Sequence, residues 1–114
     1  MMNNVNSENY ISMEQLEIYA HILKVIAHPV RLCIVKGLIE NGGCNVSRIY
    51  SSLGIPQSTI SQHLAKLKTA GLVTGERRGN EIIYTVESPE AKRLIKCMVE
   101  SSKNSEIQKK KFSL

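Results

Sequence analysis

The fold of this chain is decided by residues 55–73, which read IPQSTISQHLAKLKTAGLV. Ile60, Leu64 and Leu67 recur every three to four residues, which is the spacing of one face of a helix. Hydroxyl, amide and cationic side chains lie between these apolar positions, and Gly71 closes the segment. Such a helix is either a solvated surface helix or one whose polar face binds a partner. Its own pattern does not choose between the two.

The preceding segment predicts a short helix followed by a turn. Residues 45–54, NVSRIYSSLG, begin with Asn45 as an N-cap and stop at Gly54, which favours the left-handed conformation that ends a helix. Pro56 suits the start of the next helix. Two helices joined by LGIP form a helix-turn-helix arrangement, in which the second helix enters the major groove of DNA.

Two more helices are expected before this pair. SMEQ at residues 12–15 has the form of a capping box, and apolar residues follow it at helical spacing. That first helix is apolar on more than one face, so we expect it to pack on its own domain and on a second copy of the chain. Pro29 opens the second helix, and Gly42 and Gly43 end it.

The periodicity changes after Gly71. Residues 72–86, LVTGERRGNEIIYTV, contain two β-rich runs around a turn, which predicts a hairpin. Ser88 as N-cap and Pro89 as first helical residue then open a last helix. Its apolar stripe contains Ala91, Leu94, Ile95, Met98 and Val99.

The polar positions of the quoted helix and the tip of the hairpin fit the chemistry of DNA. Glutamine pairs with adenine through two hydrogen bonds, serine and threonine bond bases or phosphates, and a helix N-terminus attracts phosphate. An arginine-tipped hairpin can contact phosphates or a narrow minor groove. We therefore expect contacts to DNA from Gln57, Ser58, Thr59, Ser61, Gln62, His63, Lys66, Arg77, Arg78, Gly79 and Asn80.

Three stretches, in this order, resemble the ArsR/SmtB family of bacterial winged helix-turn-helix repressors. They are AHPVRLCIV at 27–35, PQSTISQHLAKLKTAGLV at 56–73 and RRGNEIIYTV at 77–86. The resemblance implies a mainly α fold with a small β-hairpin between the fourth and fifth helices. It also implies a homodimer, joined through the first and last helices, that represses transcription at an inverted-repeat operator in double-stranded DNA. The interface residues we expect are Leu16, Tyr19, Leu23, Leu94, Ile95 and Met98.

The metal positions of that family are not matched in this sequence. Where the third helix would carry a Cys-Val-Cys unit, residues 45–47 read NVS, and residues 88–104 contain no histidine for the site on the last helix. His21 and His28 are seven residues apart but lack a thiol or carboxylate at matching spacing. We expect no metal and no cofactor.

Three alternatives for the signal stay open at this point: a redox or reactive-sulfur signal, no small ligand at all, and, least favoured, a metal. Another branch of the family senses redox state through one cysteine on the second helix and one on the last, and Cys33 and Cys97 lie on those helices, although earlier along each than in that branch. Arg31 would lower the pKa of Cys33, whereas burial beside the core would make this thiol unreactive. Cys44, in a glycine-flanked loop, is expected to be exposed and unpaired.

Other function classes fit less well. Ser61 and His63 project about 200° apart on a helix and lack an acid partner, which argues against an enzyme. A module that had lost DNA binding would not keep its basic residues on the quoted helix and hairpin, and the net charge of +5 suits a polyanionic partner.

We expect three regions along the chain. These are a flexible arm over residues 1–11, the DNA-binding and dimerisation domain over 12–103, and a basic flexible tail over 104–114. The sequence contains no run of about 18 apolar residues and no leader pattern, so we expect a cytoplasmic protein with no membrane partner.

Overall fold

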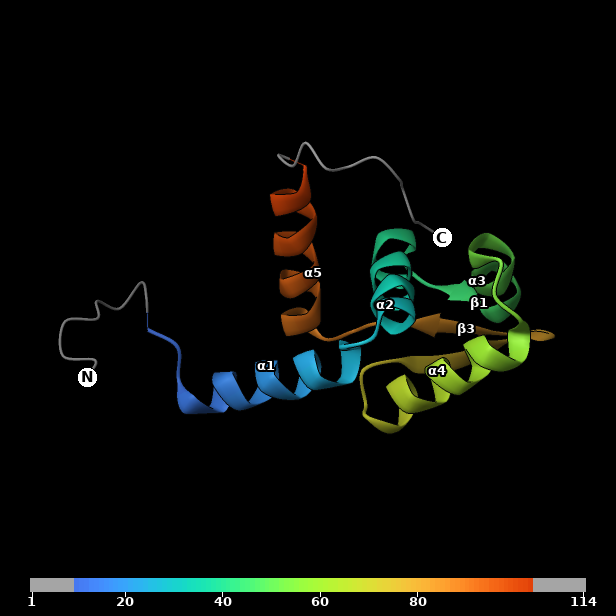
Figure 1. Ribbon diagram of the computed structural model, residues 1–114. Helices are drawn as coiled ribbons and strands as arrows, with labels where there is room; N and C mark the ends of the chain where they lie inside the picture. The colour runs from blue at the N-terminus through green and yellow to red at the C-terminus, as the bar shows by residue number, and fades with distance from the viewer. Residues whose placement is uncertain (1–9, 104–114) are drawn as a thin grey trace.

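The computed structural model describes residues 10–103, which form five helices and three short strands (Figure 1). In order, these elements are α1 Met13–Ile26, α2 Pro29–Asn41, β1 Cys44–Asn45, α3 Val46–Leu53, α4 Gln57–Thr69, β2 Thr74–Arg78, β3 Glu81–Thr85 and α5 Pro89–Ser102. The predicted winged helix-turn-helix is confirmed. Most of the expected N-terminal arm (residues 1–9) and the whole expected tail (residues 104–114) lie outside the described residues.

The helices begin where the sequence predicts because their caps form. Ser12, Asn45 and Ser88 each accept a hydrogen bond from the backbone N–H three residues later, at 2.8 to 3.1 Å. Gln15 completes the predicted capping box of α1 by accepting from the backbone N–H of Ser12. The cap of α2 was not predicted from the sequence: it is His28, whose Nδ1 accepts from the N–H of residue 30 at 3.1 Å.

One apolar core joins the elements. The predicted anchors of α4, Ile60, Leu64 and Leu67, are 0 to 3% exposed. They pack with fully buried residues of α2 and α3, among them Ile34 and Ile49. Helix α4 is therefore held by the face that the periodicity identified, and its opposite face is left to solvent.

The sheet has three strands, whereas only the hairpin was predicted. β1 pairs antiparallel with β3, with Cys44 opposite Tyr84 and Asn45 opposite Ile83, and β2 pairs with the other edge of β3. A strand of two residues has no periodicity that a sequence could reveal. Because of this pairing, Cys44 is only 6% exposed and belongs to the core, so the expectation of an exposed loop cysteine was wrong.

β1 also connects the hairpin to the helix-turn-helix. The side chain of Asn45 caps α3 through its Oδ1, and its Nδ2 donates to the carboxylate of Glu81 in β3 at 3.2 to 3.3 Å. Glu81 is paired with Arg78 beside the turn of the hairpin, so one residue holds both the start of α3 and the tip end of the hairpin.

The elements separate into two ends. In Figure 1, α1 and α5 lie at one end, α3, α4 and the hairpin at the other, and α2 stands between them. In residues 10–103, no helix has both the length and the apolar character needed to cross a bilayer.

Candidate nucleic-acid interface

Helix α4 presents a polar face opposite its buried anchors. Successive helical residues are about 100° apart, which places Ser58 and Gln62 close to the side opposite Ile60 and Leu64. Of the residues predicted to contact DNA from this helix, the exposed ones are Gln57, Ser58, Ser61, Gln62 and Lys66. Thr59 and His63 are half-buried at one edge of the face.

His63 contacts another helix. Its ring contacts that of His28 in a tilted arrangement, with centroids 4.5 Å apart and 47° between the ring planes. Its buried Nδ1 has no hydrogen-bond partner within the described residues. Burial lowers the pKa of His63, and the positive fields of His28, Arg31 and Lys66 lower it further. The imidazole is therefore neutral near pH 7 and lies at the edge of the polar face, against α2.

The N-terminus of α4 is open. Pro56 is the N-cap and offers no side-chain hydrogen bond. Its carbonyl accepts from the N–H groups of Thr59 and Ile60, each at 3.1 Å. No side chain caps the first N–H groups, those of Gln57 and Ser58, and the helix dipole is positive at this end. Such a helix start is suited to bind a phosphate.

The hairpin places four of the predicted residues at its exposed tip. Gly79 adopts a φ of 63° in the turn, with Arg77, Arg78 and Asn80 around it. An Nη of Arg78 lies 3.6 Å from a carboxylate oxygen of Glu76, and both side chains are more than 60% exposed. An ion pair this exposed contributes about 0–1 kcal/mol, so the guanidinium can readily exchange its carboxylate for a phosphate.

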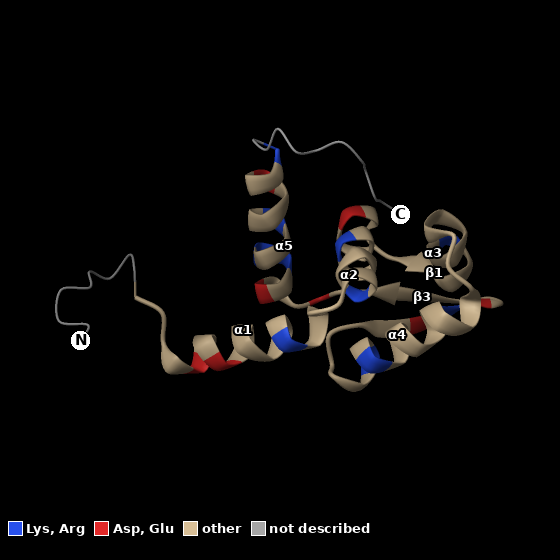
Figure 2. Cartoon of the chain, viewed as in Figure 1, with Lys and Arg blue, Asp and Glu red and all other residues tan. Residues whose placement is uncertain are grey.

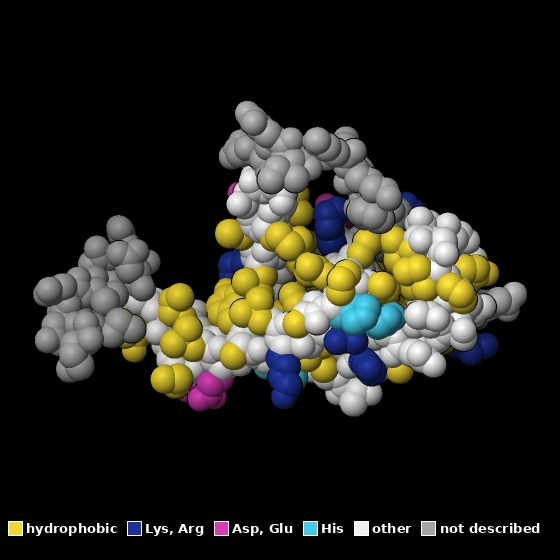
Figure 3. All heavy atoms as spheres, viewed as in Figure 1, with side chains coloured by type: hydrophobic (Ala, Val, Ile, Leu, Met, Phe, Trp, Pro, Cys, Tyr) yellow, Lys and Arg dark blue, Asp and Glu magenta, His cyan; other side chains and the backbone are white. Residues whose placement is uncertain are grey.

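Basic residues from three helices meet beside α4. A hollow of about 260 Å³ is lined by His21, Lys24, Val25, Arg31 and Lys66, from α1, α2 and α4. Basic positions occur on the last part of α1 and on α4 (Figure 2), and Lys and Arg side chains gather next to histidine over this junction (Figure 3). Lys24 and Arg31 were not among the residues predicted to contact DNA, because no sequence spacing connects positions on different helices.

His21 connects α1 to the end of α4. Its Nε2 lies 3.1 Å from the carbonyl oxygen of Ala70, the C-cap of α4. Among residues 10–103, no three His, Cys, Asp or Glu side chains are placed to hold a metal together.

The two cysteines considered for redox sensing line different hollows. Cys33 faces one of about 350 Å³ with Leu53 and Ile55, next to the turn between α3 and α4. Cys97 faces one of about 510 Å³ between α1, α2 and α5.

The thiol of Cys33 is not activated. Burial raises its pKa, Lys36 opposes that effect, and Glu40 adds to it. Arg31, which was expected to lower this pKa, instead donates from Nε to the carbonyl of Val25 at 2.7 Å.

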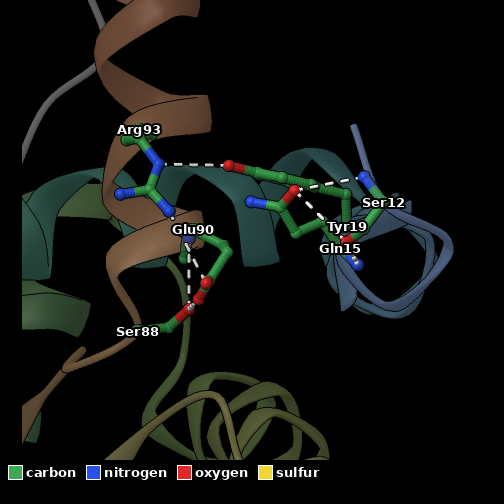
Figure 4. Close-up of polar contacts among 7 residues, drawn as sticks. Ser12, Gln15, Tyr19, Ser88, Glu90 and Arg93 are labelled. Carbon is green, nitrogen blue, oxygen red and sulfur yellow. Dashed lines mark hydrogen bonds and ion pairs between the residues drawn. The ribbon is translucent and has the colours of Figure 1, made fainter. Parts of the chain in front are cut away.

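Helices α1 and α5 are held together by a polar contact. Nε of Arg93 donates to the hydroxyl of Tyr19 at 3.1 Å (Figure 4). This use of Tyr19 within the chain was not predicted, because the residue was assigned to an interface between two copies.

An apolar surface remains uncovered on the same two helices. Leu16 and Leu23 are 43% and 52% exposed, and Leu94 and Met98 are half-buried beside them. Ile95 is different: it is 3% exposed and belongs to the core of its own chain, although it also lines the hollow between these helices.

A short helix, a turn, a helix with a free polar face and an arginine-tipped hairpin define a winged helix-turn-helix protein that binds DNA. The family model described as "Bacterial regulatory protein, arsR family" matches residues 28–74. The chain is also 38% identical over 91 residues to the transcriptional repressor PagR of Bacillus anthracis. The aligned region covers 80% of this chain and 91% of PagR. The chain belongs to the ArsR family.

Solved structures of relatives have the same fold. The crystal structure of PagR matches with a TM-score of 0.68 and 39% identity, over 76% of this chain and 99% of PagR. Reduced HlyU from Vibrio cholerae matches with a TM-score of 0.70 and 34% identity, over 78% of this chain and 94% of HlyU. The predicted family and its function, a DNA-binding transcriptional repressor rather than an enzyme, are confirmed.

Proposed function

We propose that the protein is a homodimeric repressor that acts in the cytoplasm and binds an inverted-repeat operator, with one α4 in each of two successive major grooves. The observation that carries this proposal is the polar face of α4, which is held rigidly by three buried anchors and is flanked by an exposed, basic hairpin. Rigid placement matters because base contacts require side chains to be held in a fixed position.

Gln62 is the residue we assign to base recognition. It is exposed, lies near the centre of the polar face, and has an amide that fits the two hydrogen-bonding groups of adenine. Ser58 and Ser61 flank it and reach bases or phosphates. The open N–H groups at Gln57 and Ser58 hold a phosphate at the start of the helix.

The hairpin supplies contacts that do not depend on sequence. Arg77 and Arg78 approach the phosphate backbone or the minor groove next to the site of α4. Arg77 forms no ion pair among residues 10–103, and the exposed pair of Arg78 is easily replaced.

The second copy of the chain covers the apolar surface of α1 and α5. Leu23, Leu94 and Met98 line a hollow of about 510 Å³ whose lining is almost wholly apolar, and Leu16 is exposed on the same helix as Leu23. In a two-fold dimer the same surface is used by both copies, so each would fill the hollow of the other. An inverted repeat in DNA has the same symmetry, and this gives each α4 an identical half-site.

The test is binding of the full chain to the DNA upstream of its own gene. Fluorescence anisotropy should give a lower Kd for that duplex than for a scrambled duplex of equal length and composition. Affinity for both should fall steeply as salt rises, because phosphate contacts release counterions. Equal affinity for the two duplexes, or no binding at low salt, would contradict the proposal.

A further inference from the structure

Of the residues that line the hollow between α1, α2 and α4, only Lys66 is among those expected to contact DNA. Lys24 and Arg31 bring two more cations to it, and none of its lining residues is a carboxylate. Among residues 10–103, none of these three cations forms an ion pair. Positive charges gathered without a counter-charge repel one another, which favours an anion between them.

Arg31 is held in position for such an anion. Its Nε donates to the carbonyl of Val25, in the last turn of α1, where no later helical N–H is available to that oxygen. This bond fixes the plane of the guanidinium. The Nη groups make no hydrogen bond within the described residues, so a planar donor pair is left free to bind oxygen atoms.

The hollow lies at the edge of the face that we assign to base recognition. Lys66 is about 40° around the axis of α4 from Gln62. The strand backbone that borders the major groove runs along the side of an inserted helix. The lowered pKa of His63, to which Arg31 and Lys66 contribute, shows that the field of these cations extends along the same flank of α4.

We infer that Lys24, Arg31 and Lys66 together bind one phosphate of the operator backbone at the rim of the major groove. This inference rests on the proposed function. Arg31 supplies directional hydrogen bonds and the two lysines supply charge. A contact to phosphate carries no sequence information, so its role is to set the depth and register at which Gln62 meets the bases.

Capping and dipole effects explain only part of this arrangement. A cation in the last turn of a helix is favoured by the helix dipole, which accounts for Lys24, and the bond to Val25 accounts for Arg31 as a structural residue. Neither effect brings Lys66 of α4 into the same hollow.

The experiment compares Lys24→Gln with Lys96→Gln in the full chain. Lys24 makes no hydrogen bond or ion pair in the described residues, so its substitution removes charge without removing an internal contact. Lys96 is an exposed lysine on α5, away from the hollow, and serves as the matched loss of charge. Affinity for the upstream duplex and for the scrambled duplex is measured by anisotropy over a series of salt concentrations.

We expect Lys24→Gln to weaken binding to both duplexes by the same factor and to reduce the log–log salt slope by up to about 0.9 for each protomer. Lys96→Gln should keep the affinities and slope of the wild type. Arg31→Gln should show the same loss as Lys24→Gln, with thermal unfolding recorded because Arg31 also bonds α1.

Equal slopes and affinities for Lys24→Gln and Lys96→Gln, with the wild type binding its operator, would overturn the inference and leave the proposed function in place. Absence of binding by the wild type would overturn the proposed function instead. Melting in sodium phosphate and in sodium chloride at equal ionic strength tests for a free anion. A rise of Tm in phosphate that Lys24→Gln abolishes, together with unchanged duplex affinity in Lys24→Gln, would assign the hollow to inorganic phosphate alone and also overturn the inference.

Discussion

The imidazole rings of His28 and His63 contact each other with centroids 4.5 Å apart and planes tilted by 47°, and they join the N-cap of α2 to the flank of α4. Nδ1 of His28 accepts a hydrogen bond from the N–H of Val30, which requires that this nitrogen carry no proton. Nδ1 of His63 is buried without a partner. The helix that we propose enters the major groove is therefore held on one flank by this contact between two imidazole rings.

Acid should destabilise the fold through His63. Its pKa is lowered in the folded chain, chiefly by burial, so the unfolded chain binds the proton more tightly. The resulting stability is fully present above the unfolded pKa of about 6.5 and is lost as the pH falls from there through the folded value. Urea unfolding at pH 7.5, 6.5 and 5.5 measures this. His63→Phe should flatten the profile over that range, and Gln62→Ala should not. Parallel profiles for His63→Phe and wild type would contradict the assignment.

Substitutions on α4 and on the hairpin should separate base recognition from backbone binding. Gln62→Ala should reduce the discrimination between operator and scrambled DNA by about 1–3 kcal/mol, because it removes paired hydrogen bonds to a base. Arg77→Gln should weaken binding to both duplexes alike and lower the salt slope. Anisotropy titrations at two or more salt concentrations distinguish the two effects. If Gln62→Ala lowered the affinity for both duplexes equally, Gln62 would not be a residue of base recognition.

Charge on the uncovered apolar surface should dissociate the dimer. Leu23→Glu or Met98→Glu would place a carboxylate where we propose that the second copy packs, and burying an unpaired charge costs several kcal/mol. Sedimentation equilibrium should then show a monomer with an unchanged circular dichroism spectrum. Ile82→Glu, at an exposed apolar residue of β3, is the control and should stay dimeric. A dimeric Leu23→Glu protein would place the interface elsewhere.

The two glycines after α2 should differ in their tolerance of a side chain. A Cβ at Gly43, with φ at +107°, would lie 2.7 Å from a methyl of Thr85 and 3.1 Å from the carbonyl oxygen of Tyr84. At Gly42, with φ at +67°, it would meet nothing within 4 Å. We expect Gly42→Ala to cost about 1 kcal/mol through backbone strain alone and Gly43→Ala to cost more, with β1 displaced from β3. Urea unfolding measures the loss of stability for both variants. Equal losses would contradict the prediction, because they would show that the contact of residue 43 with β3 is relieved without cost.

Cys33 should be a slow nucleophile. Because burial raises its pKa, the thiolate forms only at a pH above the ordinary thiol range near 8.5, and alkylation by iodoacetamide should follow that rise. Diamide should not join Cys33 to Cys97 within one chain, since they line separate hollows. Mass spectrometry of tryptic peptides, with Cys33→Ser and Cys97→Ser as references, measures both. A Cys33–Cys97 peptide with unchanged DNA affinity in both serine variants would show a disulfide without a sensing role, and a lost affinity that the variants restore would support redox sensing.

Local signals made most of the fold predictable. Serine and asparagine caps, glycine stops and the spacing of Ile60, Leu64 and Leu67 act over a few residues, so they can be read along the chain. The hairpin was predictable for the same reason, since its turn residues lie together between two β-rich runs. The exposed positions of α4 followed from its buried ones, except that Thr59 and His63 are half-buried.

Contacts between distant segments were not predictable in this way. β1 exists because Cys44 and Asn45 meet the edge of β3, and the contact of His28 with His63 depends on how α2 packs against α4. Ile95 shows a related limit, because its own chain leaves it only 3% exposed although it also lines the hollow that we propose the second copy fills. Periodicity shows that a face is apolar but not whether the same chain or a second one covers it.

The pairing of β1 with β3 has a mechanical consequence for any signal received at α1 and α5. Asn45 bonds both the start of α3 and Glu81, and Glu81 is paired with Arg78 beside the turn of the hairpin. The arginine tip is therefore tied to the helix-turn-helix and does not swing freely at the end of its two strands. A change of angle between two protomers would then move α4 and the arginines of each half-site together, as one rigid unit.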